Sequence, residues 1–309
     1  MINKSILVFY YVLCFNLIYS QTYNDSLLSG KNFNKAAFRM WIPEDLGSMQ
    51  GILIIMPGYE GDGRGAVADS FWQSVARKFQ FALLGCYFTN YPGDDLYERN
   101  YCNVKEGSGT ALVNAINNLA VKSSHPELKY VPFFMWGHSA GGQFNYEFAC
   151  WKSDRIIGFV VNKGGYYFSG LAPKETRNTP GLFIIGDEDY DYRKNSVKAI
   201  FTMNRKLGAF WTFASEPEQA HGVGKTQKLA IAFFEEIMPL RMKKPFSADS
   251  TFNKLSDISI EDSFFGDINK HTYASYTIWD KDLNQFNTWL PSIKFANAWL
   301  QFLSPKSVK

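Results

Sequence analysis

The chain has 309 residues, of which 46% are hydrophobic and 20% charged, and its formal net charge is +3. This composition excludes a disordered or fibrous protein, and the scattered positive charges do not form a surface for nucleic acid. The length suits one large α/β domain with a single core.

The first twenty residues, MINKSILVFYYVLCFNLIYS, have the layout of a secretory signal peptide. An early lysine is followed by an apolar stretch from Ile6 to Ile18, and the small residue Ser20 precedes Gln21. An uncleaved anchor is the alternative, because the stretch is only a few residues short of the roughly 18 to 20 that span a bilayer. We expect cleavage, no later membrane span, and a secreted or periplasmic protein.

Strands and helices are predicted to alternate from about residue 38 to residue 242. Uninterrupted apolar runs predict strands within 38–45, 51–58, 81–88, 131–137, 156–165, 181–189 and 209–218. Helical spacing predicts helices within 68–79, 110–125, 140–151, 193–208 and 226–242. This alternation predicts an α/β fold over residues 21–244, with a mostly parallel central sheet and helices on both faces.

Cleavage would leave three cysteines, Cys86, Cys102 and Cys150. An odd number permits at most one internal disulfide. If one forms, we expect Cys86 to pair with Cys102, because Cys86 ends a predicted strand and Cys102 lies in the loop that follows. No Cys/His cluster has zinc spacing, and we expect neither a metal nor an organic cofactor.

The segment GHSAGG follows a buried predicted strand directly and opens a helix, with Ser139 between Gly137 and Gly141. A serine on such a sharp turn is held in a strained backbone conformation with its hydroxyl exposed at the edge of the sheet, and the glycines remove colliding side chains. A structural Gly-rich turn is the alternative. The strand-to-helix context favours Ser139 as a catalytic nucleophile.

A serine hydroxyl is a poor nucleophile unless a base takes its proton, and the chain has four histidines. His125 precedes a proline and is expected on a surface loop, and the side chain of His138 must point away from its neighbour Ser139. His221 lies in a loop between a predicted strand and a helix, where it can reach the sheet edge. We prefer it to His271, which lies in a polar region near the C-terminus.

The carboxylate that orients the base should follow a strand located between the serine and the histidine. The predicted strand GLFIIGDED offers Asp189, three residues after a turn glycine, with Asp187 as the second choice. A solvated acidic turn or a cation site is the alternative for this cluster. Backbone N–H groups of Ala140 and Tyr59 are the expected oxyanion donors, the latter from the glycine-rich loop PGYEGDGRG. That loop lacks the Gly-Lys-Ser/Thr ending of a phosphate-binding loop.

With Ser139, Asp189 and His221 in this order, the sequence resembles the α/β-hydrolase superfamily over roughly residues 38 to 242. GHSAGG, the PGY loop and the GDED turn are similar to those of dienelactone hydrolases, feruloyl and acetyl esterases and polyhydroxyalkanoate depolymerases. The resemblance implies an acyl-enzyme on Ser139 that is hydrolysed by water activated through His221. The usual His-Gly of the oxyanion loop is here Pro57-Gly58.

Access to this site is expected to be open. Only about twenty residues separate the two strands between which lids are commonly inserted in the superfamily, so we expect no large lid domain. Four aromatic residues near loop ends could line an acyl or sugar pocket or belong to the core: Tyr59, Trp136, Tyr166 and Tyr167.

Residues 245–309 are polar and Ser/Asp-rich, followed by a predicted helix within 293–303. We expect an extension packed on the same domain and not a second catalytic domain. The sequence predicts a secreted hydrolase of carboxylic esters, small or polymer-borne, with acyl or feruloyl esters on polysaccharide as candidates. A serine peptidase of the same fold and a non-catalytic secreted binding module are the alternatives.

Overall fold

The computed structural model describes residues 21–44, 46–93, 100–245, 254–279 and 287–304. The predicted signal peptide, residues 1–20, lies outside the described residues. The strands of the main sheet are β1 (Gln21–Leu27), β2 (Lys35–Ile42), β3 (Gly51–Met56), β4 (Phe81–Thr89), β5 (Phe133–His138), β6 (Ile156–Asn162), β7 (Gly181–Gly186) and β8 (Trp211–Glu216).

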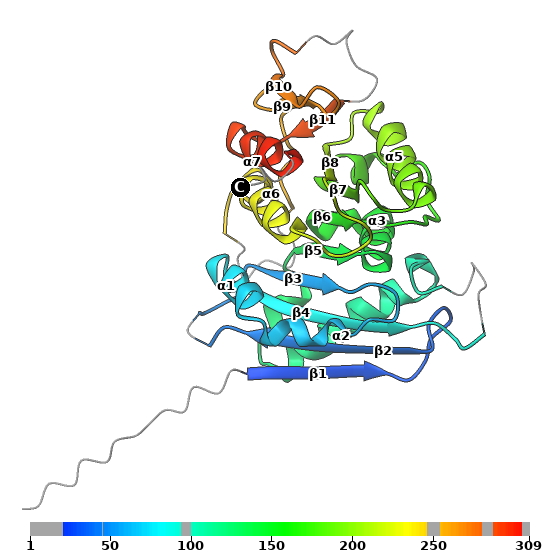
Figure 1. Ribbon diagram of the computed structural model, residues 1–309. Helices are drawn as coiled ribbons and strands as arrows, with labels where there is room; N and C mark the ends of the chain where they lie inside the picture. Colours follow the sequence, from blue (N-terminus) through cyan, green and yellow to red (C-terminus); the bar gives the residue numbers. More distant parts are fainter. Residues whose placement is uncertain (1–20, 45, 94–99, 246–253, 280–286, 305–309) are drawn as a thin grey trace, which may run out of the picture.

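These eight strands form one sheet in the order β1-β2-β4-β3-β5-β6-β7-β8, with β2 alone running antiparallel to its neighbours (Figure 1). The central strands are apolar on both faces. Every residue of β3, β6 and β7 is buried, as expected for parallel strands covered by helices on either side. The predicted mostly parallel sheet is confirmed.

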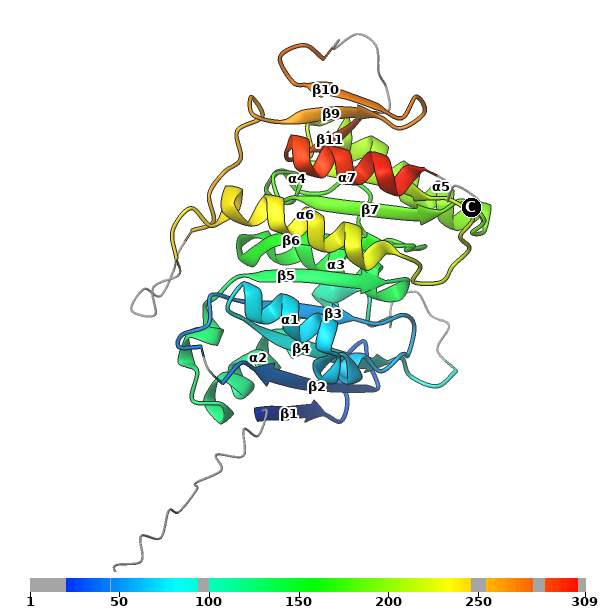
Figure 2. The same ribbon diagram turned by 60° about the vertical axis from the view of Figure 1, so that its left-hand side comes forward.

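The helices are α1 (Ser70–Lys78), α2 (Ser108–Lys122), α3 (Ala140–Lys152), α4 (Lys174–Arg177), α5 (Asp191–Arg205), α6 (Thr226–Arg241) and α7 (Ile293–Leu303). Helices α1 and α6 cover one face of the sheet and α2, α3 and α5 the other (Figures 1 and 2). Between β6 and β7 the chain forms only the one-turn helix α4, so no large lid is inserted there. In the described part of the chain, no helix combines the length and the hydropathy that crossing a membrane requires.

The C-terminal segment packs on the edge strand β8. Its short strands β9 (Phe264–Asp267), β10 (Thr272–Ser275) and β11 (Asn287–Leu290) form a separate antiparallel sheet in the order β10-β9-β11. Side chains of this segment bind the edge backbone. The Phe213 N–H donates to the Thr288 hydroxyl at 2.6 Å, and the Trp299 indole N–H donates to the Phe213 carbonyl at 2.7 Å. The extension therefore satisfies backbone groups of a strand edge that would otherwise be open to pairing.

The suggested disulfide between Cys86 and Cys102 is wrong, because both are free thiols. Cys86 is buried within the central strand β4, paired to β2. The Cys102 thiol is directed toward the start of α3, where it donates to the Ala140 carbonyl at 3.2 Å. Burial raises the pKa of both thiols, which keeps them protonated and unreactive.

Candidate active site

Ser139 lies on the turn between β5 and α3, and its backbone is strained. Its φ of 54° and ψ of −121° are rare for a residue with a side chain. The neighbouring glycines make this turn possible. A Cβ on Gly137 would lie 2.3 Å from the Gly141 carbonyl oxygen, and one on Gly141 would lie 2.1 Å from the Met56 carbonyl oxygen. The pattern G-x-S-x-G is therefore required by backbone packing at this sheet edge.

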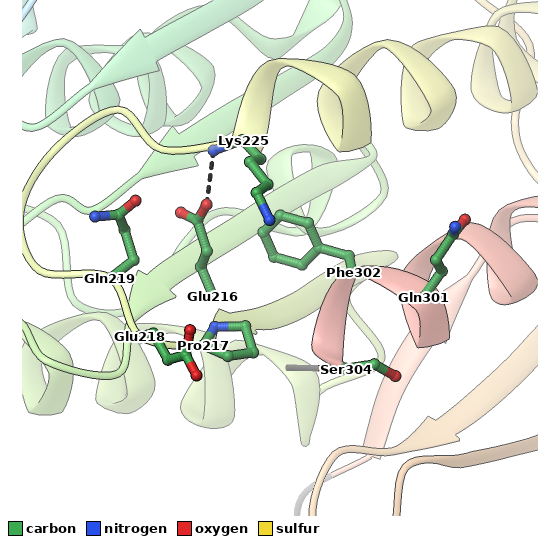
Figure 3. A pocket seen from close by; sticks show the side chains of 8 residues that line it. All are labelled: Glu216, Pro217, Glu218, Gln219, Lys225, Gln301, Phe302 and Ser304. Atoms are coloured by element: carbon green, nitrogen blue, oxygen red, sulfur yellow. Dashed lines mark hydrogen bonds between the residues drawn. The ribbon is translucent and has the colours of Figure 1, made fainter. Parts of the chain in front are cut away.

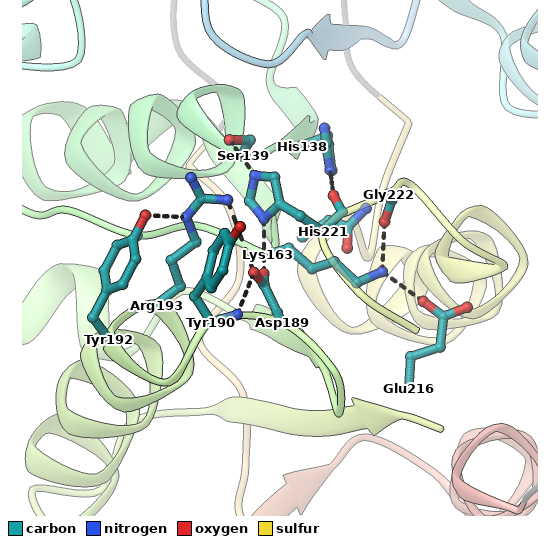
Figure 4. Close-up of polar contacts among 12 residues, drawn as sticks. His138, Ser139, Lys163, Asp189, Tyr190, Tyr192, Arg193, Glu216, His221 and Gly222 are labelled. Atoms are coloured by element: carbon teal, nitrogen blue, oxygen red, sulfur yellow. Dashed lines mark hydrogen bonds and ion pairs between the residues drawn. The ribbon is translucent and has the colours of Figure 1, made fainter. Parts of the chain in front are cut away.

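The structure brings Ser139, His221 and Asp189 together in one chain of hydrogen bonds (Figure 4). His221 Nδ1 lies 2.7 Å from Asp189 Oδ2, and His221 Nε2 lies 2.8 Å from Ser139 Oγ. Because an ionised carboxylate only accepts, Nδ1 carries the ring proton, and Nε2 accepts the hydrogen of the serine hydroxyl. This is the arrangement in which a histidine can take a proton from an attacking serine.

Asp189 is placed by the turn that follows β7. Its Oδ1 accepts the Tyr190 N–H at 2.8 Å, while Oδ2 faces His221, and its side chain is 2% exposed. The second choice for the acid, Asp187, is exposed and bonds the Ser215 hydroxyl instead. Of the two candidates for the acid, Asp189 is therefore the one that contacts His221.

The other histidines have structural partners or lie elsewhere. His138 Nε2–H donates to the His221 carbonyl at 2.7 Å, so this ring holds the loop that carries His221. Burial lowers the pKa of His138 to about 4, which keeps the ring neutral at physiological pH. His125 contacts Glu127 away from the site, and His271 is exposed in the turn between β9 and β10.

A buried ion pair between Lys163 and Glu216 supports the loop that carries His221. Lys163 follows β6 with a φ of 55°, and its side chain is 0% exposed. Its Nζ donates to Glu216 Oε2 at 2.6 Å and to the Gly222 carbonyl at 2.7 Å. Glu216 in turn accepts the Lys225 N–H at 2.6 Å. The pair thus ties both ends of the segment 222–225, directly after His221, to the sheet.

The carboxylate side of this pair borders a groove at the surface. Figure 3 shows the groove between the turn after β8 and the C-terminal end of α7, with the Glu216–Lys225 hydrogen bond at its inner wall. Phe302 of α7 lines it from the extension. The extension therefore adjoins the base of the histidine loop. The sequence analysis did not identify Lys163, because its partners Glu216 and Gly222 lie 53 and 59 residues later in the chain.

The two expected oxyanion donors flank Ser139. Ala140 is the first residue of α3, and the first N–H groups of a helix have no acceptor within it. Tyr59 belongs to a tight turn closed by the Gly61 N–H donating to the Gly58 carbonyl at 2.9 Å. That turn lies against the serine, since a Cβ on Gly58 would be 3.6 Å from the Ser139 Cβ. The turn that contains Tyr59 and the start of α3 therefore both lie beside Ser139, and Tyr59 and Ala140 stay the predicted donors to an oxyanion.

The four aromatic residues singled out in the sequence divide into two pairs. Tyr59 and Tyr166 are exposed, at 58% and 59%, and can contact a ligand. Trp136 is buried beside Trp72 with ring centroids 5.4 Å apart, and Tyr167 packs edge-on against a buried tyrosine. Trp136 therefore belongs to the core, and Tyr167 is partly buried against it.

No family model and no curated protein matches the sequence. Solved structures do match. One is poly(aspartic acid) hydrolase-1 from Sphingomonas sp. KT-1, at a TM-score of 0.51 and 18% identity, covering 68% of this chain and 97% of that one. A poly(3-hydroxybutyrate) depolymerase from Bordetella parapertussis matches at a TM-score of 0.50 and 12% identity, covering 74% of this chain and 93% of that one. A ferulic acid esterase matches at a TM-score of 0.50 and 11% identity, covering 68% of this chain and 94% of that one.

These matches span nearly the whole of each neighbour. The chain has the α/β-hydrolase fold. In α/β-hydrolases the nucleophile follows a central strand, and the acid and the histidine come later in the chain. Ser139, Asp189 and His221 occupy this order on the α/β-hydrolase sheet described above.

Proposed function

We propose that the protein is a serine hydrolase that cleaves carboxylic esters through an acyl-enzyme. The observation that carries the proposal is the hydrogen-bonded series from Asp189 through His221 to Ser139, at 2.7 Å and 2.8 Å. A strained serine, a histidine within hydrogen-bond distance and a buried orienting carboxylate are the parts that activate a hydroxyl.

In the proposed reaction, Ser139 Oγ attacks the ester carbonyl carbon while its proton passes to His221 Nε2. Asp189 stabilises the resulting imidazolium. The carbonyl oxygen becomes an oxyanion facing the N–H groups of Ala140 and Tyr59. When the tetrahedral intermediate collapses, the C–O bond to the alcohol breaks and His221 gives the alcohol its proton. Water then attacks the acyl carbon while giving a proton to His221. The C–O bond to Ser139 Oγ breaks, the acid leaves, and His221 returns the proton to Ser139.

The substrate class follows from access to the site. The short α4 connection between β6 and β7 carries no lid, which favours a bulky or polymer-borne ester over a sequestered lipid. The exposed rings of Tyr59 and Tyr166 favour an aryl or sugar group beside the ester. We propose acyl or aryl-acyl esters on a polysaccharide as the natural class, and export of the protein through the signal-peptide pattern of residues 1–20.

Hydrolysis of a chromogenic ester tests the proposal. The wild type should release 4-nitrophenol from 4-nitrophenyl hexanoate, and Ser139→Ala should lower kcat by on the order of 10³-fold or more. Ser74→Ala is the matched control, because this serine is on α1 and only bonds the Phe71 carbonyl. A Ser139→Ala variant that retains wild-type turnover would contradict the proposal.

A further inference from the structure

Four side chains form a rim directly beside the acid of the triad. Tyr166 follows β6, and Tyr190, Tyr192 and Arg193 lie at the start of α5. The Tyr190 and Tyr192 rings are stacked, with centroids 6.0 Å apart and an interplanar angle of 13°. The ring centroid of Tyr166 lies 6.1 Å from that of Tyr192. The three tyrosines are exposed at 59%, 68% and 47% in chain order. We call these four residues the Arg193 rim.

The guanidinium of Arg193 is held among these rings (Figure 4). It lies 5.7 Å from the Tyr190 ring centroid and 5.4 Å from that of Tyr192. Its Nε–H donates to the Tyr192 hydroxyl at 2.9 Å. The stem of Arg193 packs toward Gly165, where a Cβ would lie 3.4 Å from Arg193 Cγ. The group therefore has a fixed position.

Arg193 forms an ion pair with Asp189 but has few hydrogen-bond acceptors among the described residues. Its Nη1 lies 3.8 Å from Asp189 Oδ1, beyond hydrogen-bond distance. Both oxygens of Asp189 already accept shorter bonds, from the Tyr190 N–H and from His221. An arginine has five N–H donors, and only Nε–H has a hydrogen-bond acceptor among the described residues. The other four N–H donors therefore have no acceptor among the described residues, although the side chain is only 25% exposed.

We propose that Arg193 binds a carboxylate of the substrate next to the scissile ester, so that the preferred esters carry a negative charge. A planar guanidinium with two free Nη groups matches a carboxylate by two parallel hydrogen bonds. The flanking rings of Tyr190 and Tyr192 limit its hydration and offer apolar faces to the neighbouring part of the substrate. The inference rests on the proposed esterase function and adds the substrate's charge to it.

Two pairs of esters test this inference, each matched except for the charge. Mono-4-nitrophenyl adipate and 4-nitrophenyl hexanoate place or omit a carboxylate on the acyl side. 4-Acetoxybenzoate and 4-acetoxybenzamide do so on the alcohol side. Each ester is assayed with the wild type, Arg193→Gln and Lys194→Gln. The last variant removes the same charge one residue later, where the lysine bonds the Asp187 carbonyl and pairs with Asp191.

Arg193→Gln should lower kcat/KM for the anionic member of at least one pair by about 10- to 100-fold, the worth of a hydrogen bond to a charged group. The neutral member of that pair should change by less than about threefold, and Lys194→Gln should change neither selectively. An equal loss on both members would show that Arg193 only positions Asp189, and no loss on any ester would show that it binds nothing; either result overturns the inference. If the wild type still hydrolyses the neutral esters in either of these cases, the proposed esterase function stands. A wild type that is inactive on all four esters would overturn both the role of Arg193 and the esterase function.

Discussion

Replacing Lys163 by methionine should destabilise the protein severely, since the substitution breaks a fully buried ion pair. Lys163 is 0% exposed and Glu216 5%, so the remaining carboxylate would lie almost without water. The Gly222 carbonyl would also lose the donor that now lies 2.7 Å away. Removing one partner of such a pair costs about 3–5 kcal/mol. The Lys225 N–H, still bonded to Glu216, places the expected loss at the lower end of that range.

Urea unfolding monitored by tryptophan fluorescence measures this loss as a change in the midpoint at constant slope. The double variant Lys163→Met/Glu216→Gln is the control, because the neutral amide can still accept the Lys225 N–H while no charge is buried. It should recover about half of the lost stability. A single variant within 1 kcal/mol of the wild type, or a double variant less stable than the single one, would refute the role assigned to the pair.

Two further changes are expected to have measurable effects. Gly141→Ala should destabilise the protein by about 1–3 kcal/mol and impair turnover, because its Cβ would meet the Met56 carbonyl. Gly65→Ala is the control and should do neither, because a Cβ there would have no atom within 4 Å. Equal urea midpoints for the two variants would contradict this prediction. His138 has a folded-state pKa of about 4 against 6.5, so the unfolded chain takes up its proton first as the pH falls. The free energy of unfolding should therefore drop by about 3 kcal/mol between pH 6.5 and 4, at about 1.4 kcal/mol per pH unit. His138→Asn should flatten that part of the stability curve. An unchanged pH dependence in the variant would contradict the lowered pKa of His138.

The central sheet could be predicted because its strands are buried on both faces and therefore apolar throughout. β1 could not, since its sequence QTYNDSL is polar and largely exposed, and it is held by pairing with β2 and by hydrogen bonds from α2 to Asp25. The strands β9, β10 and β11 are four residues each, too short to show a periodic pattern. Their position depends on contacts with β8 that are distant in the sequence.

The candidate triad could be chosen from the sequence because the chain offers few alternatives. Four histidines and one GDED turn leave a short search, and parallel strands bring their carboxyl ends to one edge. The supporting residues carry no such signal. Lys163 and Arg193 act through side-chain contacts across strands and loops, and nothing in their local sequence indicates a partner. The choice of Cys86 with Cys102 failed for a similar reason, because the thiol of Cys102 bonds Ala140, which is distant in the sequence.

The most direct test of the account is labelling with a fluorophosphonate probe, followed by peptide mapping by mass spectrometry. An activated serine hydroxyl displaces fluoride from the probe and keeps the phosphonyl group, so the wild type should carry one label, on Ser139. His221→Ala should label far more slowly and Ser139→Ala not at all, while Ser74→Ala should label like the wild type. A folded wild-type protein that takes up no label, or one labelled equally in the Ser139→Ala variant, would contradict the assignment of Ser139 as the nucleophile.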